Sequence, residues 1–304
     1  MKKTFAKFIR GLMWVLAQLP LKVHYFFGDI MSWVLGCVFR YRTNVVWMNI
    51  SRSFPKSKYH DLKQVYQAFY KHLGEIAAEA IWFGGSSRKR LARARIVTVK
   101  NPEVLAQMYE NSPSVTMMCS HCGNWEILGG VYGYFTQDGF VPPFGEEAFT
   151  FVYKRLSNEL SDMVFGANRV YPLECDPTDS AVESNNILRF AIRNRHQKRI
   201  YGYPADQTPY RGMGRHDMGI FLNQQTYAMT GSLGVACKLS HSVVYLKMKH
   251  LERGKYEWEF IPICEDASKH DPDVLMRKYY DLLEQEIMET PHNWLWSHNR
   301  WKIG

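Results

Sequence analysis

The stretch of the chain best suited to chemistry is residues 119–126, CSHCGNWE. It contains a CxxC pair, a histidine between the two cysteines and a carboxylate five residues after that histidine. These residue types suit a redox pair, a metal site, a cysteine nucleophile or a histidine base with a carboxylate partner. The spacing within the stretch and the elements around it discriminate among the four.

The cysteines fit the first three chemistries poorly. A structural zinc site needs four ligands, commonly in two close pairs, and no second CxxC or HxxxH follows this one. A thioredoxin-like pair would begin a helix, whereas Cys119 ends the apolar run 114–119. Cys122 as a nucleophile beside His121 stays open, because a turn can bring neighbouring side chains together. The favoured interpretation is that both cysteines pack at the end of a strand.

His121 and Glu126 fit the fourth chemistry if the chain turns between them. On a regular helix a five-residue step would place them about 140° apart. Gly123 allows a turn before the helix and Asn124 is a good N-cap for it. We then expect Glu126 to accept the Nδ1 proton of His121, so that Nε2 is free as a base. The helix N-terminus would offer N–H groups to an oxyanion or a phosphate. The competing interpretation is that His121 has no catalytic role and is a core or surface residue whose hydrogen bonds are satisfied.

The elements that must position this turn alternate between strands and helices. Apolar or alternating runs predict strands at 114–119, 149–153, 199–203, 242–248 and 256–261. Helical periodicity and capping residues predict helices at 59–83, 125–135, 157–166, 179–194, 228–240 and 271–289. This alternation favours an α/β fold, a mixed sheet flanked by helices.

The charge of the chain is concentrated at its start. The net charge is +9, and residues 1–100 contain 18 Lys and Arg against 4 Asp and Glu. A basic N-terminal third indicates an anionic partner. Nucleic acid is not expected, because the basic residues flank apolar runs and show no recognition-helix pattern. The scattered cysteines are typical of reduced thiols in the cytosol.

Two apolar runs, 12–19 and 23–39, predict an N-terminal helical membrane anchor. Neither is a clean stretch of about 18–20 apolar residues, so the sequence leaves open whether this segment spans the membrane or lies on it. No A-x-A cleavage site follows, so we do not expect a removable signal peptide. Two helices in the membrane interface fit better, with Trp14, Tyr25 and Trp33 as anchors. A buried helical hairpin is the alternative. We therefore divide the chain into a membrane-associating segment, 1–42, and a catalytic domain, 43–304.

Four further segments accompany CSHCGNWE in a familiar order. They are YRTNVVWMNISRSFP (41–55), VYKRLSNELSDMVFGANR (152–169), GYPADQTP (202–209) and PHNWLWSHNRWK (291–302). Together they resemble the bacterial lipid A biosynthesis acyltransferases, of the late, lauroyl- or myristoyl-transferring type. SHCGNWE is similar to the HX4(D/E) motif of glycerolipid-type acyltransferases. The resemblance covers nearly the whole chain and implies that family's fold.

The resemblance also implies roles for individual residues. It places the catalytic histidine at His121 and its acidic partner at Glu126, and it adds Arg169 and Asp206 to the site. By residue type, Arg169 suits a phosphate or carboxylate, and Asp206 lies at the end of a predicted strand. The remaining substrate-binding candidates are Asn124, Lys154 and Arg155, the last two for a sugar phosphate or an acidic carrier protein. Aromatic side chains near the site, Trp125, Phe135, Phe149 and Phe151, are candidates for an acyl slot or for plain core.

The implied reaction is transfer of a fatty acyl chain from a thioester on acyl carrier protein to a hydroxyl of a lipid A precursor. No metal and no cofactor beyond the carrier's phosphopantetheine thioester are implied. The partners would be acyl carrier protein, the precursor and inner-membrane phospholipids, at the cytoplasmic face of the inner membrane. Coenzyme A as donor, another glycolipid or an aminolipid as acceptor, and a non-catalytic membrane lipid-binding protein are the alternatives.

Overall fold

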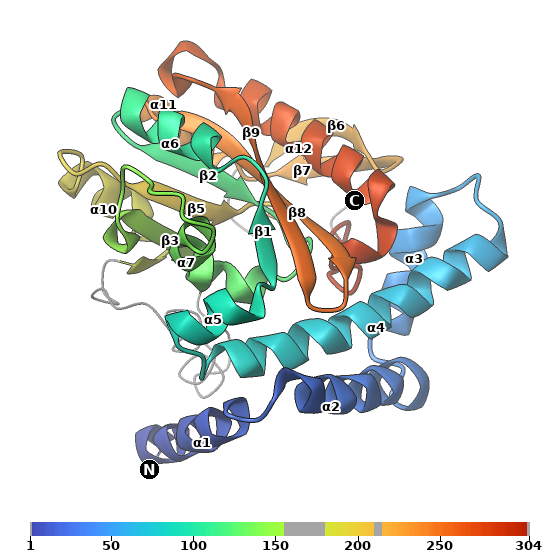
Figure 1. Cartoon of the computed structure of the whole chain (residues 1–304). Coiled ribbons are helices and arrows are strands. Elements are labelled where there is room, and N and C mark those ends of the chain that lie inside the picture. Colours follow the sequence, from blue (N-terminus) through green and yellow to red (C-terminus); the bar gives the residue numbers. More distant parts are fainter. Residues whose placement is uncertain (1, 155–179, 210–214, 303–304) are drawn as a thin grey trace.

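The computed structural model describes residues 2–154, 180–209 and 215–302, and a seven-stranded mixed sheet forms its centre (Figure 1). The strand order is β1-β9-β8-β2-β5-β3-β4, and β8 and β9 form an antiparallel hairpin while the other neighbouring strands pair in parallel. The strands are β1 (Val97–Val99), β2 (Val115–Cys119), β3 (Phe149–Tyr153), β4 (Ala181–Glu183), β5 (Ile200–Pro204), β8 (Ser242–Glu252) and β9 (Lys255–Cys264). The α/β prediction, a mixed sheet flanked by helices, is confirmed.

Strand β2 shows how the sheet separates two hydrophobic cores. All five of its residues are buried, as expected for a central parallel strand with both faces covered. Val115 and Met117 belong to one core and Met118 to the other. Helices α11 (Gly231–Lys238) and α12 (Pro272–Glu289) contribute to the core of Met118. Helices α5 (Arg88–Ala94), α6 (Pro102–Asn111) and α7 (Val131–Thr136) contribute to the opposite core.

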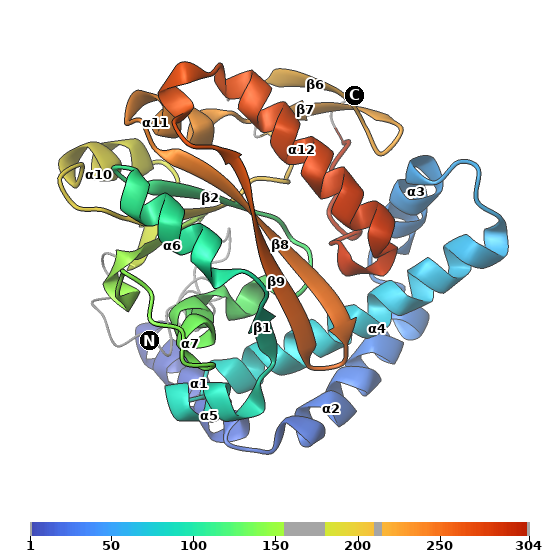
Figure 2. The ribbon, with the colours of Figure 1, turned by 45° about the horizontal axis from the view of Figure 1, so that its top comes forward.

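The longest helix, α4 (Tyr59–Phe83), runs below the tip of the β8–β9 hairpin (Figure 1). Its outer side is covered by α2 (Leu21–Trp33), and the two helices come close where Gly28 meets Gly74. A Cβ on Gly28 would lie 2.6 Å from the carbonyl oxygen of Gly74, so neither helix tolerates a larger residue there. Helix α1 (Lys2–Ala17) lies beyond them at the edge of the molecule (Figures 1 and 2).

The N-terminal helices expose large apolar side chains. Trp14 and Trp33 are 52% and 61% exposed. Other aromatic and aliphatic side chains of these helices are exposed as well, among them Leu12, Val15, Phe26, Phe27 and Ile30. The alternative of a buried hairpin is therefore wrong. Tyr25 is not an outward anchor, because its hydroxyl donates to Oε1 of buried Glu79 at 2.8 Å. Among the described helices, none has the length and apolarity needed to cross a membrane.

Most of the predicted elements are present close to their predicted bounds. Helices α4 and α12 and strand β3 match to within a residue. The predicted helix 179–194 is partly wrong, because β4 precedes a shorter α10 (Ile187–Arg193), and the predicted helix 157–166 lies outside the described residues. Elements not predicted as such include β1, α5, α6, α3 (Thr43–Ser53), the π-helix Val34–Val38, the hairpin β6 (His216–Phe221) and β7 (Gln224–Ala228), and the 3-10 turns Glu146–Ala148, Ala267–Lys269 and Pro291–Asn293.

Candidate active site

The register of two parallel strands brings His121 and Asp206 together. Strands β2 and β5 pair with Cys119 opposite Pro204, the last residue of each strand. Parallel neighbours end at the same edge of a sheet, where substrate sites of α/β proteins commonly lie. His121 and Asp206 each follow two residues after that paired end. The two side chains therefore meet, although 85 residues separate them in the sequence.

The contact between these two residues fixes the imidazole. Nδ1 of His121 lies 2.6 Å from Oδ1 of Asp206, and the backbone N–H of His121 donates to Oδ2 at 3.0 Å. Nε1 of Trp294 donates to the same Oδ2 at 2.8 Å. Burial alone would raise the pKa of Asp206, but the charge and hydrogen bonds of His121 and the bond from Trp294 outweigh it and hold that pKa well below its usual range. Asp206 is thus an ionised acceptor, and the shared proton belongs on Nδ1.

In the neutral form of His121, with its proton on Nδ1, Nε2 carries the lone pair. The side-chain amide of Gln207 lies 3.1 Å from it, in position to donate a hydrogen bond. The His121 side chain is 14% exposed, so it is reachable from outside while Asp206 behind it is buried. A neutral imidazole with this tautomer is a competent general base.

The predicted contact between Glu126 and Nδ1 of His121 is wrong in this structure. Nδ1 of His121 is hydrogen-bonded to Asp206 instead, and Oε1 of Glu126 accepts a hydrogen bond from Nε1 of Trp125 at 3.0 Å. The ring of Trp125 in turn lies edge-on to His121, with 5.1 Å between the ring centroids. The segment after the turn is a tight 3-10 helix, Trp125–Gly130, rather than the start of the predicted α-helix. Glu126 is thereby linked to the imidazole through Trp125.

The predicted turn and cap are confirmed. Gly123 has φ +59°, and a Cβ there would lie 2.8 Å from the carbonyl oxygen of Met248. Oδ1 of Asn124 accepts from the backbone N–H of Glu126 at 3.1 Å, as an N-cap should. Its Nδ2 donates to Oε2 of Glu79 at 2.7 Å. Because both ends of this buried amide bind the protein, Asn124 positions the turn; its substrate binding stays a prediction.

The backbone N–H groups expected to hold an oxyanion mostly have partners. Those of His121 and Glu126 donate to Asp206 and Asn124. Those of Cys122 and Gly123 donate to Oγ of Ser120 and to Asn293. The expectation of a helix N-terminus open to an oxyanion is therefore wrong for these four groups. The side-chain amide of Gln207, 3.1 Å from Nε2 of His121, is a further donor at this site.

The prediction that both cysteines pack in the core is confirmed. Cys119 and Cys122 are fully buried free thiols. Burial raises the pKa of each thiol well above its ordinary value, and the charges of Asp206 and Glu286 raise them further. A buried thiol held in its protonated form is neither a nucleophile nor a redox group.

The predicted substrate-binding residues lie partly outside the described chain. Arg155 and Arg169 fall among the residues that the structure does not describe. Lys154 directly follows β3, at the same edge of the sheet as the ends of β2 and β5. Burial and the nearby charge of Lys302 lower its pKa. Of the four aromatic candidates for an acyl slot, Phe135 and Phe149 are core residues that both pack on Phe144, and Trp125 and Phe151 are half-buried.

The structure adds three residues that the sequence did not single out. Gln207 and Trp294 contact the dyad (His121 and Asp206) directly. His298 lies near it, and burial lowers the pKa of His298 to about 4, so its imidazole is neutral at pH 7. All three fall within segments that carried the family resemblance, 202–209 and 291–302. Only their side-chain contacts identify them as members of the site.

A small pocket includes residues that follow Asp206 in the chain. It begins at Thr208, two residues after Asp206, and includes two guanidinium groups, Arg215 and Arg300. Its other lining residues are Pro209, Gln225, Tyr227 and Trp301. Of the two, Arg300 is buried and donates to the Tyr227 carbonyl and the Tyr280 hydroxyl, whereas Arg215 is exposed and suits an anionic group on a substrate.

The C-terminal segment closes the site from the other side. Backbone atoms of Cys122 and Trp294 form an antiparallel bridge, and Asn49 of α3 donates to the carbonyls of Trp296 and His298. Arg42 donates to the carbonyl of Ser297. Four of the five segments that carry the resemblance are thus in contact: 119–126 contacts 202–209 and 291–302, and 41–55 contacts 291–302. The segment 152–169 is described only up to Lys154.

Comparisons with known proteins agree with this geometry. The family model for bacterial lipid A biosynthesis acyltransferases matches residues 2–303. The lipid A biosynthesis palmitoleoyltransferase of Escherichia coli K12 is 21% identical over 296 residues, which is 96% of this chain and 89% of that protein. A lipid A biosynthesis acyltransferase of Shigella flexneri gives the same identity and coverage. The chain therefore belongs to the bacterial lipid A biosynthesis acyltransferases, and it is an acyltransferase enzyme.

Proposed function

We propose that this enzyme transfers a fatty acyl chain from a thioester on acyl carrier protein to a hydroxyl of a lipid A precursor, with His121 as the general base and Asp206 as its orienting carboxylate. The observation that carries the mechanism is the 2.6 Å contact between Nδ1 of His121 and Oδ1 of Asp206, which leaves Nε2 as the basic atom. No metal and no further cofactor are part of this proposal.

In the proposed reaction the acceptor hydroxyl takes the place of the Gln207 amide at Nε2. Nε2 removes the hydroxyl proton while the oxygen attacks the thioester carbonyl carbon. The displaced Gln207 amide donates to the oxyanion of the tetrahedral intermediate. The C–S bond then breaks, the ester forms, and the imidazolium returns its proton to the leaving thiolate. Asp206 stabilises the imidazolium throughout without taking the proton.

The other predicted residues are assigned by charge and position. Arg169 and Arg155, together with Lys154 at the sheet edge, would bind phosphate groups of the acceptor or the acidic carrier protein. Arg215, which lines the pocket that includes Thr208, adds a further cation. The Arg300 guanidinium in that pocket is buried and donates to the Tyr227 carbonyl and the Tyr280 hydroxyl. Glu126 supports the imidazole through Trp125. A phosphorylated glycolipid is the acceptor that such a set of cations favours.

The exposed apolar side chains of α1 and α2 support the proposal that the enzyme works on the cytoplasmic face of the inner membrane. Phe8, Trp14 and Trp33 would insert at the level of the headgroups, and inner-membrane phospholipids would be their partners. Arg40 and Arg42 follow these helices and suit anionic headgroups. A surface-bound arrangement presents the site to a lipid acceptor and to a soluble carrier protein at once.

The decisive experiment compares His121→Ala with Cys122→Ala in purified enzyme. His121→Ala should lower transfer from lauroyl- or myristoyl-carrier protein to a lipid A precursor by at least about 10³-fold, because the base is lost. Cys122→Ala should remain active, because the thiol is buried and protonated. An inactive but folded Cys122→Ala enzyme would replace the base mechanism with a thiol nucleophile.

Donor and acceptor are tested separately. Matched acyl chains on carrier protein and on coenzyme A should differ in kcat/KM, with the carrier preferred because cationic side chains can bind its acidic surface. Mass spectrometry of lipid A from a deletion strain should show the loss of one acyl chain. Unchanged lipid A with a change in another glycolipid or an aminolipid would reassign the acceptor.

A further inference from the structure

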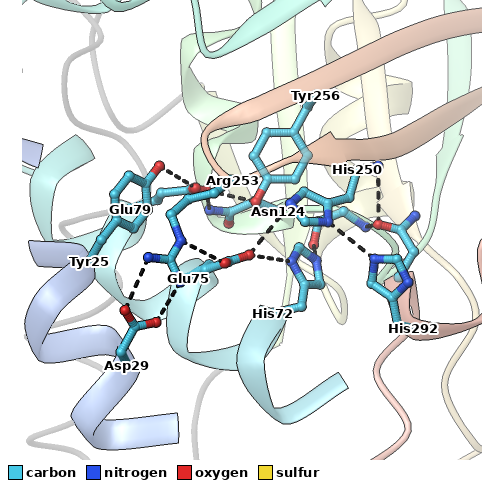
Figure 3. Close-up of polar contacts among 12 residues, drawn as sticks. Tyr25, Asp29, His72, Glu75, Glu79, Asn124, His250, Arg253, Tyr256 and His292 are labelled. Atoms are coloured by element: carbon cyan, nitrogen blue, oxygen red, sulfur yellow. Dashed lines mark hydrogen bonds and ion pairs between the residues drawn. The ribbon is translucent and has the colours of Figure 1, made fainter. Parts of the chain in front are cut away.

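A second group of histidines adjoins the catalytic turn from the opposite direction. His72 and Glu75 come from α4, His250 from the end of β8, and His292 from the turn Pro291–Asn293, and Figure 3 shows their side chains converging. These four residues are called the histidine cluster below. His72 and Glu75 are 2% and 3% exposed. Nε2 of His72 lies 3.2 Å from the carbonyl oxygen of Gly123, within the catalytic turn.

Two ring nitrogens of the cluster point at one carboxylate oxygen. Nδ1 of His72 lies 3.6 Å and Nε2 of His250 lies 3.5 Å from Oε2 of Glu75. Neither nitrogen has a hydrogen-bond partner among the residues that the structure describes. The three residues offer ligand atoms that all lie within 4.8 Å of one another. In tetrahedral zinc sites, with metal–ligand distances of about 2.0–2.1 Å, neighbouring ligand atoms are about 3.3 Å apart.

The outer hydrogen bonds fix which ring nitrogens are free. A carbonyl oxygen only accepts, so Nε2 of His72 must carry the proton that faces Gly123, and in the neutral ring the lone pair lies on Nδ1. That lone pair faces a carboxylate oxygen. Two acceptors in a buried site repel each other unless a cation or a proton lies between them. On the other ring, Nδ1 of His250 lies 3.2 Å from Nε2 of His292, which can fix its tautomer in the same way.

The charges around Glu75 are arranged to keep it an anion. Nε of Arg253 donates to its other oxygen, Oε1, at 2.8 Å, and the same guanidinium binds Asp29 of α2 (Figure 3). This positive charge against Oε1 favours the ionised form of the buried Glu75 carboxyl. A carboxylate and neutral imidazoles are the protonation states that bind a metal.

We propose that His72, Glu75 and His250 bind one divalent transition-metal ion of the Zn²⁺ type, with water or a further group as the remaining ligand. Two imidazole nitrogens and one carboxylate oxygen are a ligand set that Zn²⁺ accepts. The ion would join α4 to the β8–β9 hairpin, and through His72 it would brace the turn at Gly123. Its role is structural, because Nε2 of His121 belongs to a separate hydrogen-bond system. The proposal stands independently of the acyl donor and acceptor.

The test uses the full-length enzyme in detergent, freed of metal by chelation and then titrated with Co²⁺ alone. Co²⁺ bound to two imidazoles and a carboxylate should give visible absorption bands that Zn²⁺ abolishes by competition. About one Zn²⁺ per chain should then be found by elemental analysis. The His72→Ala and His250→Ala variants should bind at least about tenfold more weakly, because each loses a ligand. His60→Ala, an exposed histidine on the same helix, is the matched control and should bind like the wild type.

Two measurements on the wild type protect the test against variants that fail to fold. X-ray absorption at the zinc edge should show nitrogen and oxygen ligands at about 2.0–2.2 Å, with an imidazole signature. The melting temperature should rise with added Zn²⁺ and fall with a chelator. No Co²⁺ bands, or equal binding by the control and the ligand variants, would show that the cluster holds only a shared proton and would overturn the proposal.

Discussion

Two histidine–carboxylate groups meet at the turn around Gly123, and they differ in how the carboxylate is used. In the dyad one imidazole faces Asp206 at 2.6 Å, and Trp294 and a backbone N–H complete the carboxylate's partners. In the histidine cluster two imidazole nitrogens face one oxygen of Glu75 at 3.5 and 3.6 Å. The residue types are the same. The first is a satisfied hydrogen-bond system and the second is a set of ligand atoms.

The difference shows that the balance of donors and acceptors, rather than composition, separates a base from a cation site. Each oxygen of Asp206 accepts a hydrogen bond from at least one N–H group, so this carboxylate already has its hydrogen-bond donors. Oε2 of Glu75 faces nitrogens that carry no hydrogen bond among the described residues. Both carboxylates are buried and both have a lowered pKa. Their cationic and hydrogen-bonding neighbours, and not their burial, set that direction.

The largest predicted effect breaks the dyad. Asp206→Asn should lower kcat by about 10³–10⁴-fold, because an amide can donate to Nδ1 and thereby place the imidazole proton on Nε2. KM should change little, since Asp206 is buried behind His121. Asp217→Asn, at an exposed site on β6, is the control. The Co²⁺ affinity of Asp206→Asn should equal that of the wild type, and joint loss of activity and metal binding would mean that the two groups are not separate.

A third buried carboxylate is Glu286 on α12, and no histidine or arginine among the described residues forms an ion pair with it. It accepts from the Tyr245 hydroxyl and from the backbone N–H of Met248. Burial raises its pKa from 4.5 to about 7, against the effect of these bonds. A carboxyl whose folded-state pKa is raised stabilises the protein fully below pH 4.5, and that stability is lost as the pH rises through about 7.

Glu286→Gln should therefore remove a pH dependence of up to about 3 kcal/mol between pH 5 and 8. The measurement is the melting temperature at the two pH values. The wild type should lose several degrees more than the variant on going to pH 8. Glu265→Gln, at an exposed carboxylate, should behave like the wild type. If the variant and the wild type shift equally, the Glu286 carboxyl has an ordinary pKa.

Gly123→Ala tests the link between the two groups. Its φ of +59° would strain any other residue by about 1–2 kcal/mol, and the new Cβ would also meet the Met248 carbonyl at 2.8 Å. Transfer and Co²⁺ binding should fall together, because Gly123 contacts His72 through its carbonyl and Asn293 through its N–H. Gly139→Ala has a similar positive φ of +84° in open space and controls for strain alone. Loss of only one function would show that the turn does not couple them.

Local features of the site could be predicted from the sequence. A strand-length apolar run, a glycine and an N-capping asparagine are neighbours in the chain, and each acts within a few residues. The family resemblance added Asp206 to the site but not its contact with His121. That contact depends on the register of β2 with β5, which is set by packing far from the motif.

The histidine cluster could not be predicted, because its members come from three elements distant in sequence. His72 and Glu75 are three residues apart on one face of a helix, and this spacing by itself predicts only an ordinary i,i+3 pair. His250 joins them only because the β8–β9 hairpin ends above α4. Glu126 shows the opposite error. Because it is near His121 in sequence, a contact with Nδ1 of that histidine was predicted, but in the 3-10 helix Trp125–Gly130 its carboxylate binds Nε1 of Trp125.

The smallest predicted effect decides between the two carboxylates nearest the base. Glu126→Gln keeps an oxygen for Nε1 of Trp125 and removes only the charge, so Trp125 should stay against His121. Transfer should fall by no more than about tenfold, far less than with Asp206→Asn, because the Nδ1 proton is held by Asp206. Glu110→Gln, an exposed site on α6, controls for the loss of a charge. A loss as deep as that of Asp206→Asn, at unchanged KM, would mean that Glu126 takes over Nδ1 once substrate is bound, as the motif alone suggests.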